Sequence, residues 1–144
     1  SNHKSALLVM TDRTTLITML DKLQSKNAEE VYEKMKNRLT NFNPCWIKTI
    51  TFDNGKEFAH HHKIAEDLNV KTYFTRPYTS QDKGTVENRI GVVRRFFPKK
   101  TDLRKVSEQR IKEVEKPLNY RPIRKFNYHN PIEKLKTQCV ALIT

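Results

Sequence analysis

Two acidic residues, Asp53 and Glu87, stand at positions suited to the binding of divalent metal ions. Asp53 directly follows residues 46–52, whose β-branched and aromatic side chains predict a buried strand, and Asn54 and Gly55 then signal a turn. A side chain at this point can leave the core while the backbone before it stays rigid. Carboxylate oxygens are preferred ligands of hard cations such as Mg²⁺, and such ions promote attack on phosphodiesters. The two residues are therefore candidate catalytic metal ligands.

Glu87 falls on one flank of a helix expected over residues 84–97. The apolar stripe of this helix consists of Val86, Ile90, Val93 and Phe97. At about 100° per residue, Glu87 stands roughly 90° from the centre of that stripe. Lys83 and Arg94 fall on the same flank, so phosphates and metal ions would meet a carboxylate and two cations there. Composition alone favours a plainer interpretation, in which Asp53 caps the turn and Glu87 pairs with Lys83 across one helical turn.

The charge balance favours a polyanionic partner. Lys and Arg number 28 against 16 Asp and Glu, a formal net charge of +12. Such a surplus is typical of nucleic-acid-binding proteins. A membrane partner is disfavoured because the longest apolar run, residues 6–10, is far too short to span a bilayer. Cys45 and Cys139 form no CxxC pair, so neither a zinc knuckle nor a disulfide framework is indicated, and a reducing cytoplasm is the expected location.

The elements that must position these residues alternate between strands and helices. Apolar periodicity predicts strands at 5–10, 14–20, 46–52 and 70–75, and helices at 27–40, 58–68, 84–97 and 107–118. The first two strands form a hairpin, and residues 119–144 form a basic segment broken by Pro122 and Pro131. This order predicts one α/β domain over residues 1–144, with a mixed sheet and helices on both of its faces. The aromatic residues expected in its core are Trp46, Phe52, Tyr73 and Phe74.

Three consecutive histidines, His60, His61 and His62, look like a metal cluster but cannot converge on one ion. Neighbouring residues of a helix point about 100° apart. His61 falls on the apolar side of its helix, which predicts a packed histidine rather than a zinc ligand.

Three blocks of the sequence resemble a known family. The first is Thr51, Phe52, Asp53, Asn54, Gly55, Lys56, Glu57 and Phe58, followed by His61, Ile64 and Ala65. The second is Tyr73, Phe74, Pro77, Tyr78, Gly84, Thr85, Glu87, Asn88, Gly91, Arg94, Phe97, Pro98, Lys99 and Asp102, and the third is Leu118, Asn119, Arg121, Pro122, Arg124 and Lys125. Their order, with Glu87 34 positions after Asp53, is similar to that of the bacterial insertion-sequence transposases of the family numbered thirty.

This resemblance implies an RNase H-like integrase core and a DDE triad of catalytic carboxylates. Asp53 would be the second member and Glu87 the third. The first would lie on a strand a few residues before Ser1, so the printed chain is expected to lack its first strand and to be inactive. Asp12 is a weaker substitute, because it matches a turn position of the family. The implied cofactor is Mg²⁺, with Mn²⁺ as a substitute and two ions in the complete site.

The implied partner is DNA, both the element's ends and its target, and joining two ends requires at least a dimer. Cations near the two carboxylates are expected to hold phosphates. They are Lys56, Lys83, Arg89, Arg94, Arg95, Lys99 and Lys100. Each has the alternative of lying on a merely solvated face, and so does the run of residues 121–125. The loop 80–84 departs from the family, which usually has an aromatic residue and an arginine there. That departure leaves the details of DNA contact open.

Two other functions fit the same residues. A remnant of a transposase could bind DNA without cutting it, and the missing first aspartate favours that hypothesis. An RNase H-like nuclease acting on RNA in hybrids could use the same acidic site. The block around Glu87 argues for the transposase.

Overall fold

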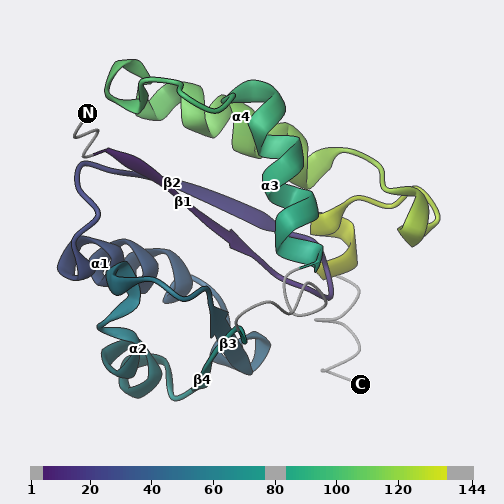
Figure 1. Ribbon diagram of the computed structural model, residues 1–144. Coiled ribbons are helices and arrows are strands. Elements are labelled where there is room, and N and C mark those ends of the chain that lie inside the picture. The colour runs from purple at the N-terminus through teal and green to yellow at the C-terminus, as the bar shows by residue number, and fades with distance from the viewer. Residues whose placement is uncertain (1–4, 77–83, 136–144) are drawn as a thin grey trace. The chain divides into compact units, whose positions relative to one another are not determined.

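The computed structural model describes residues 5–76 and 84–135, and within them the chain divides into two compact units. The first unit comprises residues 5–6 and 23–76, and the second comprises residues 7–22 and 84–135. Figure 1 labels their helices and strands. Each unit has its own strands, helices and buried side chains, and each is described by itself below.

The second unit is built on a hairpin of β1 (Ala6–Thr11) and β2 (Thr18–Leu23), which are hydrogen-bonded neighbours. The hairpin was expected, but its second strand begins four residues later than predicted. The turn takes up residues 12–17, because the Asp12 amide donates to the Ile17 carbonyl (2.9 Å) and the Leu16 amide donates to the Asp12 carbonyl (2.8 Å). The Asp12 carboxylate accepts from the Thr15 amide at 3.2 Å and from its hydroxyl. Asp12 is thus a turn residue, as the sequence indicated.

Helices α3 (Gly84–Phe96) and α4 (Glu108–Tyr120) pack on this hairpin (Figure 1). Both confirm expected helices. The Ser107 hydroxyl accepts from the Arg110 amide at 3.1 Å and caps the start of α4. The buried cluster that joins the helices to β2 consists of Leu20, Val93, Phe97, Ile111, Val114 and Leu118. Burial of this apolar surface is the main stabilising contribution to the unit.

Side chains of α4 also satisfy backbone groups of β2. The Asn119 amide group pairs twice with Thr18, accepting from its N–H at 2.8 Å and donating to its carbonyl at 2.9 Å. The Glu115 carboxylate accepts from the Leu20 N–H at 2.9 Å. Residues four apart on a helix share a face, and residues two apart on a strand present their N–H groups to the same side. The helix therefore covers an edge of β2 that would otherwise be open to another strand.

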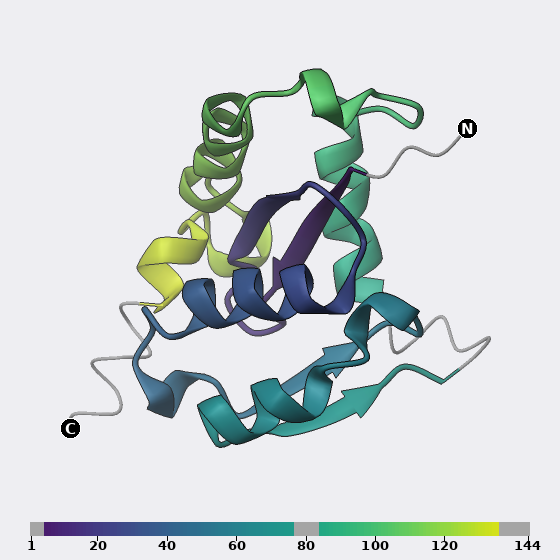
Figure 2. The same ribbon diagram turned by 90° about the vertical axis from the view of Figure 1, so that its left-hand side faces the viewer.

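The first unit is a parallel β–α–β arrangement with an additional helix (Figure 2). Strand β3 (Thr49–Phe52) pairs in parallel with β4 (Lys71–Phe74), and α2 (His61–Leu68) connects them. Helix α1 (Ala28–Leu39) is the fourth element, and the Asn27 side chain caps it by accepting from the Glu30 amide at 2.7 Å. Helix α2 begins three residues later than predicted, because Lys56–Phe58 forms a 3₁₀ turn instead of a first α-turn.

The strand expected over residues 46–52 is shorter than predicted. Residues Pro44–Trp46 form a 3₁₀ turn in which the Asn43 side chain accepts from the Cys45 amide at 3.0 Å. Proline is well suited to the first position of such a turn. Trp46 therefore lies in the turn, where it is half-buried, and the prediction that it belongs to the strand is wrong.

The two faces of the β3–β4 sheet differ in burial. The His61 ring lies 3.1 Å from the Thr72 hydroxyl and 4.9 Å from the Phe74 ring centre, so α2 covers the face that Thr72 and Phe74 share. On the other face, Thr49, Thr51, Lys71 and Tyr73 are exposed. Tyr73 is 51% exposed and Phe74 40%, so the prediction that they are core residues is wrong, while Phe52 is buried as expected. Alternation along β4 directs Tyr73 to the face opposite to the one that α2 covers.

The described strands form one two-stranded sheet in each unit, β1–β2 in the second and β3–β4 in the first. The mixture of strands and helices, and the alternation of the two after the hairpin, are as expected. The single mixed sheet with helices on both of its faces stays a prediction.

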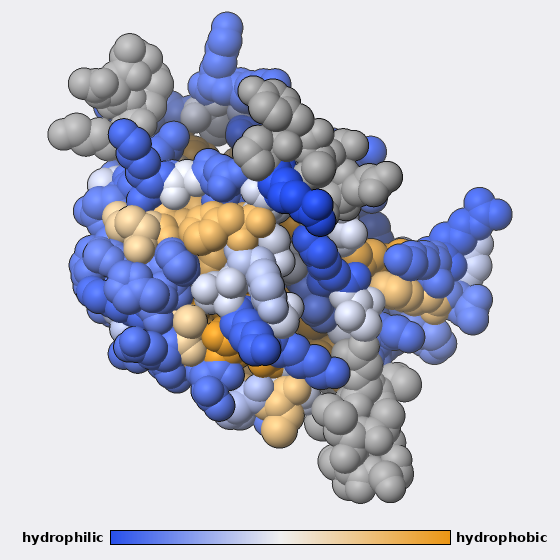
Figure 3. Space-filling view, turned by 60° about the horizontal axis from the view of Figure 1, so that its bottom comes forward, coloured by the Kyte–Doolittle hydropathy of each residue, from blue (hydrophilic) through white to orange (hydrophobic). Residues whose placement is uncertain are grey.

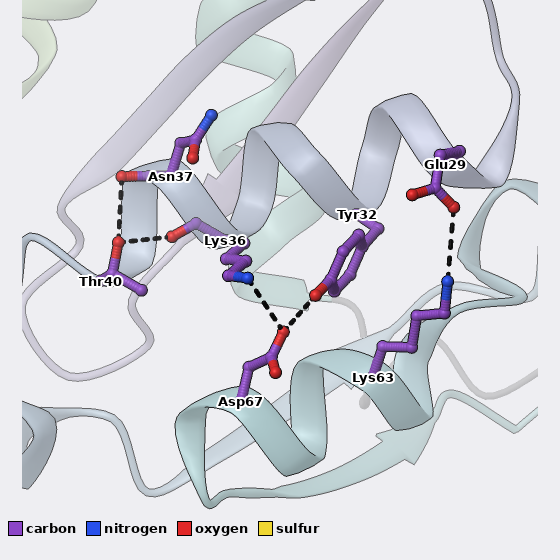
Figure 4. A network of polar contacts seen from close by, with 7 residues as sticks. All are labelled: Glu29, Tyr32, Lys36, Asn37, Thr40, Lys63 and Asp67. Atoms are coloured by element: carbon purple, nitrogen blue, oxygen red, sulfur yellow. Dashed lines mark hydrogen bonds and ion pairs between the residues drawn. The ribbon is translucent and has the colours of Figure 1, made fainter.

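Polar contacts join α1 to α2 on the surface of the first unit (Figure 4). The Asp67 carboxylate accepts from the Tyr32 hydroxyl and lies 3.7 Å from the Lys36 ammonium, while Lys63 lies 3.4 Å from Glu29. The hydrogen bond to Asp67 raises the pKa of the Tyr32 hydroxyl. Such exposed pairs typically contribute about 0–1 kcal/mol each, so they orient the two helices more than they stabilise them.

On the face that Figure 3 shows, hydrophilic side chains predominate, and hydrophobic ones lie in separate areas between them. Among the helices of residues 5–76 and 84–135, none is long and apolar enough to cross a bilayer.

Candidate metal and nucleic-acid site

Asp53 lies directly after β3, at the carboxyl end of a parallel strand pair. Its Oδ1 atom accepts a hydrogen bond from the Asn54 amide at 2.9 Å and another from the Thr75 hydroxyl at 3.2 Å. Phe52, just before it, is buried against Phe58 and Phe74, with ring centres 5.1 and 5.7 Å away. The backbone that carries Asp53 is thus anchored in the core, whereas the carboxylate itself is exposed.

Thr75 holds the two strand ends together at this point. Its amide donates to the Phe52 carbonyl at 2.9 Å, and its carbonyl accepts from the Asn54 side chain at 2.7 Å. Sequence reasoning did not single out Thr75. Its position in the sequence could have identified it, because Thr75 directly follows β4 as Asp53 directly follows β3. Parallel strands bring their carboxyl ends to the same edge of a sheet. Carboxyl ends of parallel strands are common sites for ligands.

Glu87 lies in the first turn of α3 and is exposed. A carboxylate in that turn interacts favourably with the positive end of the helix dipole. Val93 and Phe97 bury the other side of the helix, so the direction of Glu87 relative to the core is set by the helical period. Glu87 belongs to the second unit and Asp53 to the first, and their convergence on one site stays a prediction.

The donor chemistry of both residues suits a hard divalent cation. Each offers exposed carboxylate oxygens, the ligand type that Mg²⁺ and Mn²⁺ take. Over residues 5–76 and 84–135, no group of three or more His, Cys, Asp or Glu side chains is close enough to hold a metal ion.

Most of the cations expected to contact DNA are exposed. Lys56 lies on the 3₁₀ turn three residues after Asp53, and Arg94 and Arg95 lie in the last turn of α3. Lys99 and Lys100 follow that helix in a turn closed by the Thr101 amide, which donates to the Pro98 carbonyl at 3.1 Å. Lys83 and most of the loop 80–84 lie outside the described residues.

Arg89 is the exception, and the prediction that it contacts DNA is wrong. It is only 9% exposed, and its guanidinium donates to the Thr18 hydroxyl at 2.9 Å and to the Leu118 carbonyl at 3.0 Å. Burial lowers the pKa of Arg89, and the nearby charge of Arg121 lowers it further. Its side chain links α3 to β2 and α4, so its role is structural.

His61 is a packed histidine, as its place on the apolar stripe predicted. Its ring contacts Phe74 and Thr72, as described above, and lies 6.3 Å from the Phe52 ring. His60 lies instead 3.4 Å from the Glu29 carboxylate. The His62 ring centre lies 6.3 Å from that of His60 and 5.7 Å from that of His61.

Comparison with known proteins decides the family. The integrase core domain family matches residues 1–80, which is more than half of the chain and includes Asp53. The chain belongs to the integrase core domain family. This membership confirms the resemblance found in the sequence, and it implies that the mixed α/β architecture is of the RNase H-like type.

The relatives of this integrase core chain include transposases of bacterial insertion sequences. The transposase for insertion sequence element IS4351 of Bacteroides fragilis is 41% identical over 142 residues, which cover 94% of this chain and 41% of that protein. Transposase InsI for insertion sequence element IS30A of Escherichia coli K12 is 30% identical over 129 residues, which cover 90% of this chain and 34% of that protein. The chain thus spans only about one-third to two-fifths of the length of these curated relatives.

Proposed function

We propose that this chain is the catalytic core of a DNA transposase that cuts and joins strands with the help of divalent metal ions. Asp53 and Glu87 would hold the ions as the second and third members of a DDE triad. The observation that carries the proposal is the exposed Asp53 carboxylate, held by Thr75 and Asn54 at the carboxyl end of β3, in a chain of the integrase core family.

Each part of the chain would have a defined task in the reaction. When bound, the metal ions supply activation of the attacking oxygen and stabilisation of the leaving oxygen. The Thr75 hydroxyl keeps the Asp53 carboxylate in one orientation. Exposed cations hold the phosphate backbone, and we assign this role to Lys56, Lys83, Arg94, Arg95, Lys99 and Lys100. Hydrolysis at the element's end would free a 3′-hydroxyl, which would then attack a phosphodiester of target DNA.

No covalent protein intermediate is needed in this scheme, because water and then the 3′-hydroxyl serve as nucleophiles. Joining two element ends to one target requires at least a homodimer in the working complex. A protein that acts on bacterial DNA would work in the cytoplasm.

Metal binding provides the first test, since it can be measured without activity. Titration of the chain with Mn²⁺, followed by electron paramagnetic resonance, should detect binding that D53N and E87Q each weaken at least about 10-fold. That lower bound follows because even loss of an outer-shell partner typically costs about 10–100-fold. D102N is the matched control, because the Asp102 carboxylate pairs with Arg104 at 2.9 Å and should not contribute. Equal Mn²⁺ affinity in all three variants and the parent would contradict the assignment.

A second candidate function is a DNA-binding remnant that does not cut. It shares with the transposase core the formal net charge of +12, which favours a nucleic-acid partner. A chain extended at its N-terminus distinguishes the two hypotheses. With Mg²⁺, a transposase core should nick DNA that carries the element's ends and join it to a target, whereas a remnant should bind that DNA and leave it intact. An RNA–DNA hybrid added as a third substrate tests for RNase H-like cleavage.

A further inference from the structure

The segment after α4, residues 121–130, forms a loop that closes on itself, and we call it the Tyr128 loop. It contains a 3₁₀ turn, Arg124–Phe126. The Ile123 amide donates to the His129 carbonyl at 3.1 Å, and the Tyr128 amide donates back to the Ile123 carbonyl at 3.0 Å. These bonds link the two sides of the loop, so its backbone has a defined shape. In Figure 1 this yellow-green segment extends away from α3 and α4.

The base of the Tyr128 loop is anchored. Pro131 is fully buried directly after it. Asn130 and Glu133 cap the next helical turn reciprocally, since the Glu133 amide donates to the Asn130 side chain at 2.8 Å and the Asn130 amide donates to the Glu133 carboxylate at 3.2 Å. The Lys134 ammonium lies 5.6 Å from the centre of the Phe126 ring. The loop is therefore a fixed projection of the second unit.

Its tip has an unusual backbone and an exposed ring. Asn127 and Tyr128 both adopt left-handed conformations, with φ of 51° and 66°. Asparagine tolerates this region, but tyrosine seldom adopts it, and such disfavoured conformations cluster at functional sites. The Tyr128 side chain is 68% exposed, more than the exposed rings of Tyr73, Phe74 and Tyr120. The fold thus accepts a disfavoured conformation that leaves an aromatic ring in solvent.

The segment that carries this ring is rich in cations. Residues 121–134 carry four cationic side chains, namely Arg121, Arg124, Lys125 and Lys134, against one carboxylate, that of Glu133. Arg121, Arg124 and Lys125 are exposed. Glu133 is engaged by the cap described above and by His129, whose ring nitrogen lies 2.9 Å from its carboxylate. The loop therefore presents three exposed cations and one exposed ring.

A rigid loop with exposed cations and an exposed ring fits single-stranded nucleic acid. Cations neutralise phosphates, and aromatic side chains stack on bases that have no stacking partner. An acidic protein segment would match the cations but would leave the ring without a defined role. We propose that the Tyr128 loop binds DNA, with Arg124 and Lys125 on phosphates and the Tyr128 ring stacked on an unpaired base. This inference rests on the proposed function, in which cutting creates strand ends with such bases.

Fluorescence anisotropy with labelled DNA tests the inference on the 144-residue chain. Two DNAs of equal length are compared, one a blunt duplex and one with a short single-stranded overhang. Y128A should weaken binding of the overhang DNA about 5- to 150-fold, the range that corresponds to one stacked base, and should change blunt-duplex binding little. Y128F keeps the ring and should bind like the parent. Tyr128→Gly removes the ring while suiting the left-handed backbone, so it should reproduce the Y128A loss even if Y128A folds poorly.

The phosphate contacts are tested through the dependence of affinity on salt. The double variant R124A/K125A should lower the log-log slope by about one for each lost contact. The matched control is K26A/K48A, which removes two exposed cations of the first unit. Lys48 precedes β3, at the end of that strand opposite to Asp53. The control should leave the slope nearly unchanged.

The outcomes separate this inference from the proposed function. If the parent chain binds neither DNA, the proposed function fails. If the parent binds DNA and the variants Y128A, Tyr128→Gly and R124A/K125A bind both DNAs as tightly as the parent does, the Tyr128 loop is not a DNA-binding surface and the proposed function stands. If Y128A weakens blunt and overhang DNA to the same extent, stacking on an unpaired base is refuted.

Discussion

The contact between α4 and the edge of β2 predicts a large stability effect for one amide. In the variant Asn119→Ala, the N–H and the carbonyl of Thr18 both lose their partner, and Thr18 has no exposed surface. A buried backbone group without a partner costs about 1–3 kcal/mol. Two such groups, with partial relief from water that enters the space, should lower the free energy of unfolding by about 2–4 kcal/mol. A chain of this size has a total of about 7–20 kcal/mol.

The loss is measurable in two ways. In urea unfolding followed by circular dichroism, the midpoint should fall without a change in the slope m. In thermal unfolding, the midpoint should fall by about 5–15 °C, since 1 kcal/mol corresponds to roughly 2–4 °C or slightly more at this chain length. Without its cover, the edge of β2 is open to pairing with other chains, so Asn119→Ala should also aggregate more readily during heating.

Two controls make the measurement specific. Glu115→Gln retains an oxygen that can accept from the Leu20 amide, so it should cost less than about 1 kcal/mol. Asn41→Ala removes an exposed amide that donates to the Asn37 carbonyl at 3.1 Å, and it should stay within about 0.5 kcal/mol of the parent. If Asn119→Ala were no more destabilising than Asn41→Ala, the argument that side chains of α4 satisfy the β2 edge would be refuted.

Three further predictions follow from single side chains. R89M should destabilise the chain by about 2–4 kcal/mol and leave the salt slope of DNA binding unchanged. R94A should leave the stability nearly unchanged and lower that slope by about one. Urea melts measure the first effect and gel-shift titrations the second. The Arg104 guanidinium lowers the pKa of Asp102 from its ordinary 3.8 to about 2, so the stability that Asp102 contributes is complete above about pH 4 and is lost as pH falls through 2. Melting points of D102N and the parent should therefore converge near pH 2, and a constant gap down to that pH would refute the ion pair's role. T75V should weaken Mn²⁺ binding about 10–100-fold because Asp53 loses its hydroxyl partner, while T75S should retain it; equal affinities would remove Thr75 from the site.

Much of the local structure was predictable because it depends on near neighbours in the chain. The helical period of Val86, Ile90 and Val93 predicted α3, and the apolar pattern before Asp53 predicted a strand that ends at that residue. Strand boundaries were less accurate. Strand β2 begins later than predicted because of the turn that Asp12 closes, and β3 begins later because of the 3₁₀ turn before Ile47. In both turns, side-chain hydrogen bonds to the backbone compete with strand pairing.

Arg89 and Arg94 illustrate what periodicity leaves open. Both flank the apolar stripe of α3 at roughly similar angles, on opposite sides. The angle of a residue around the helix predicts how near its side chain lies to the core, but it does not predict which hydrogen-bond acceptors lie beside that side chain. The Thr18 hydroxyl and the Leu118 carbonyl lie on the side of Arg89, so that guanidinium is buried, whereas Arg94 is exposed.

The sequence by itself determined the family, the order of helices and strands, and the position of Asp53 at the end of a strand, because motif spacing and apolar period are properties of the chain alone. Only the tertiary structure decided that Thr75 holds Asp53, that Asn119 covers the edge of β2, and that Tyr73 lies in solvent. Each of these depends on which atoms distant segments bring together, and on which face of a strand they cover. Hydrogen-bond partners separated by up to 101 positions, as Thr18 and Asn119 are, leave no periodic trace in the sequence.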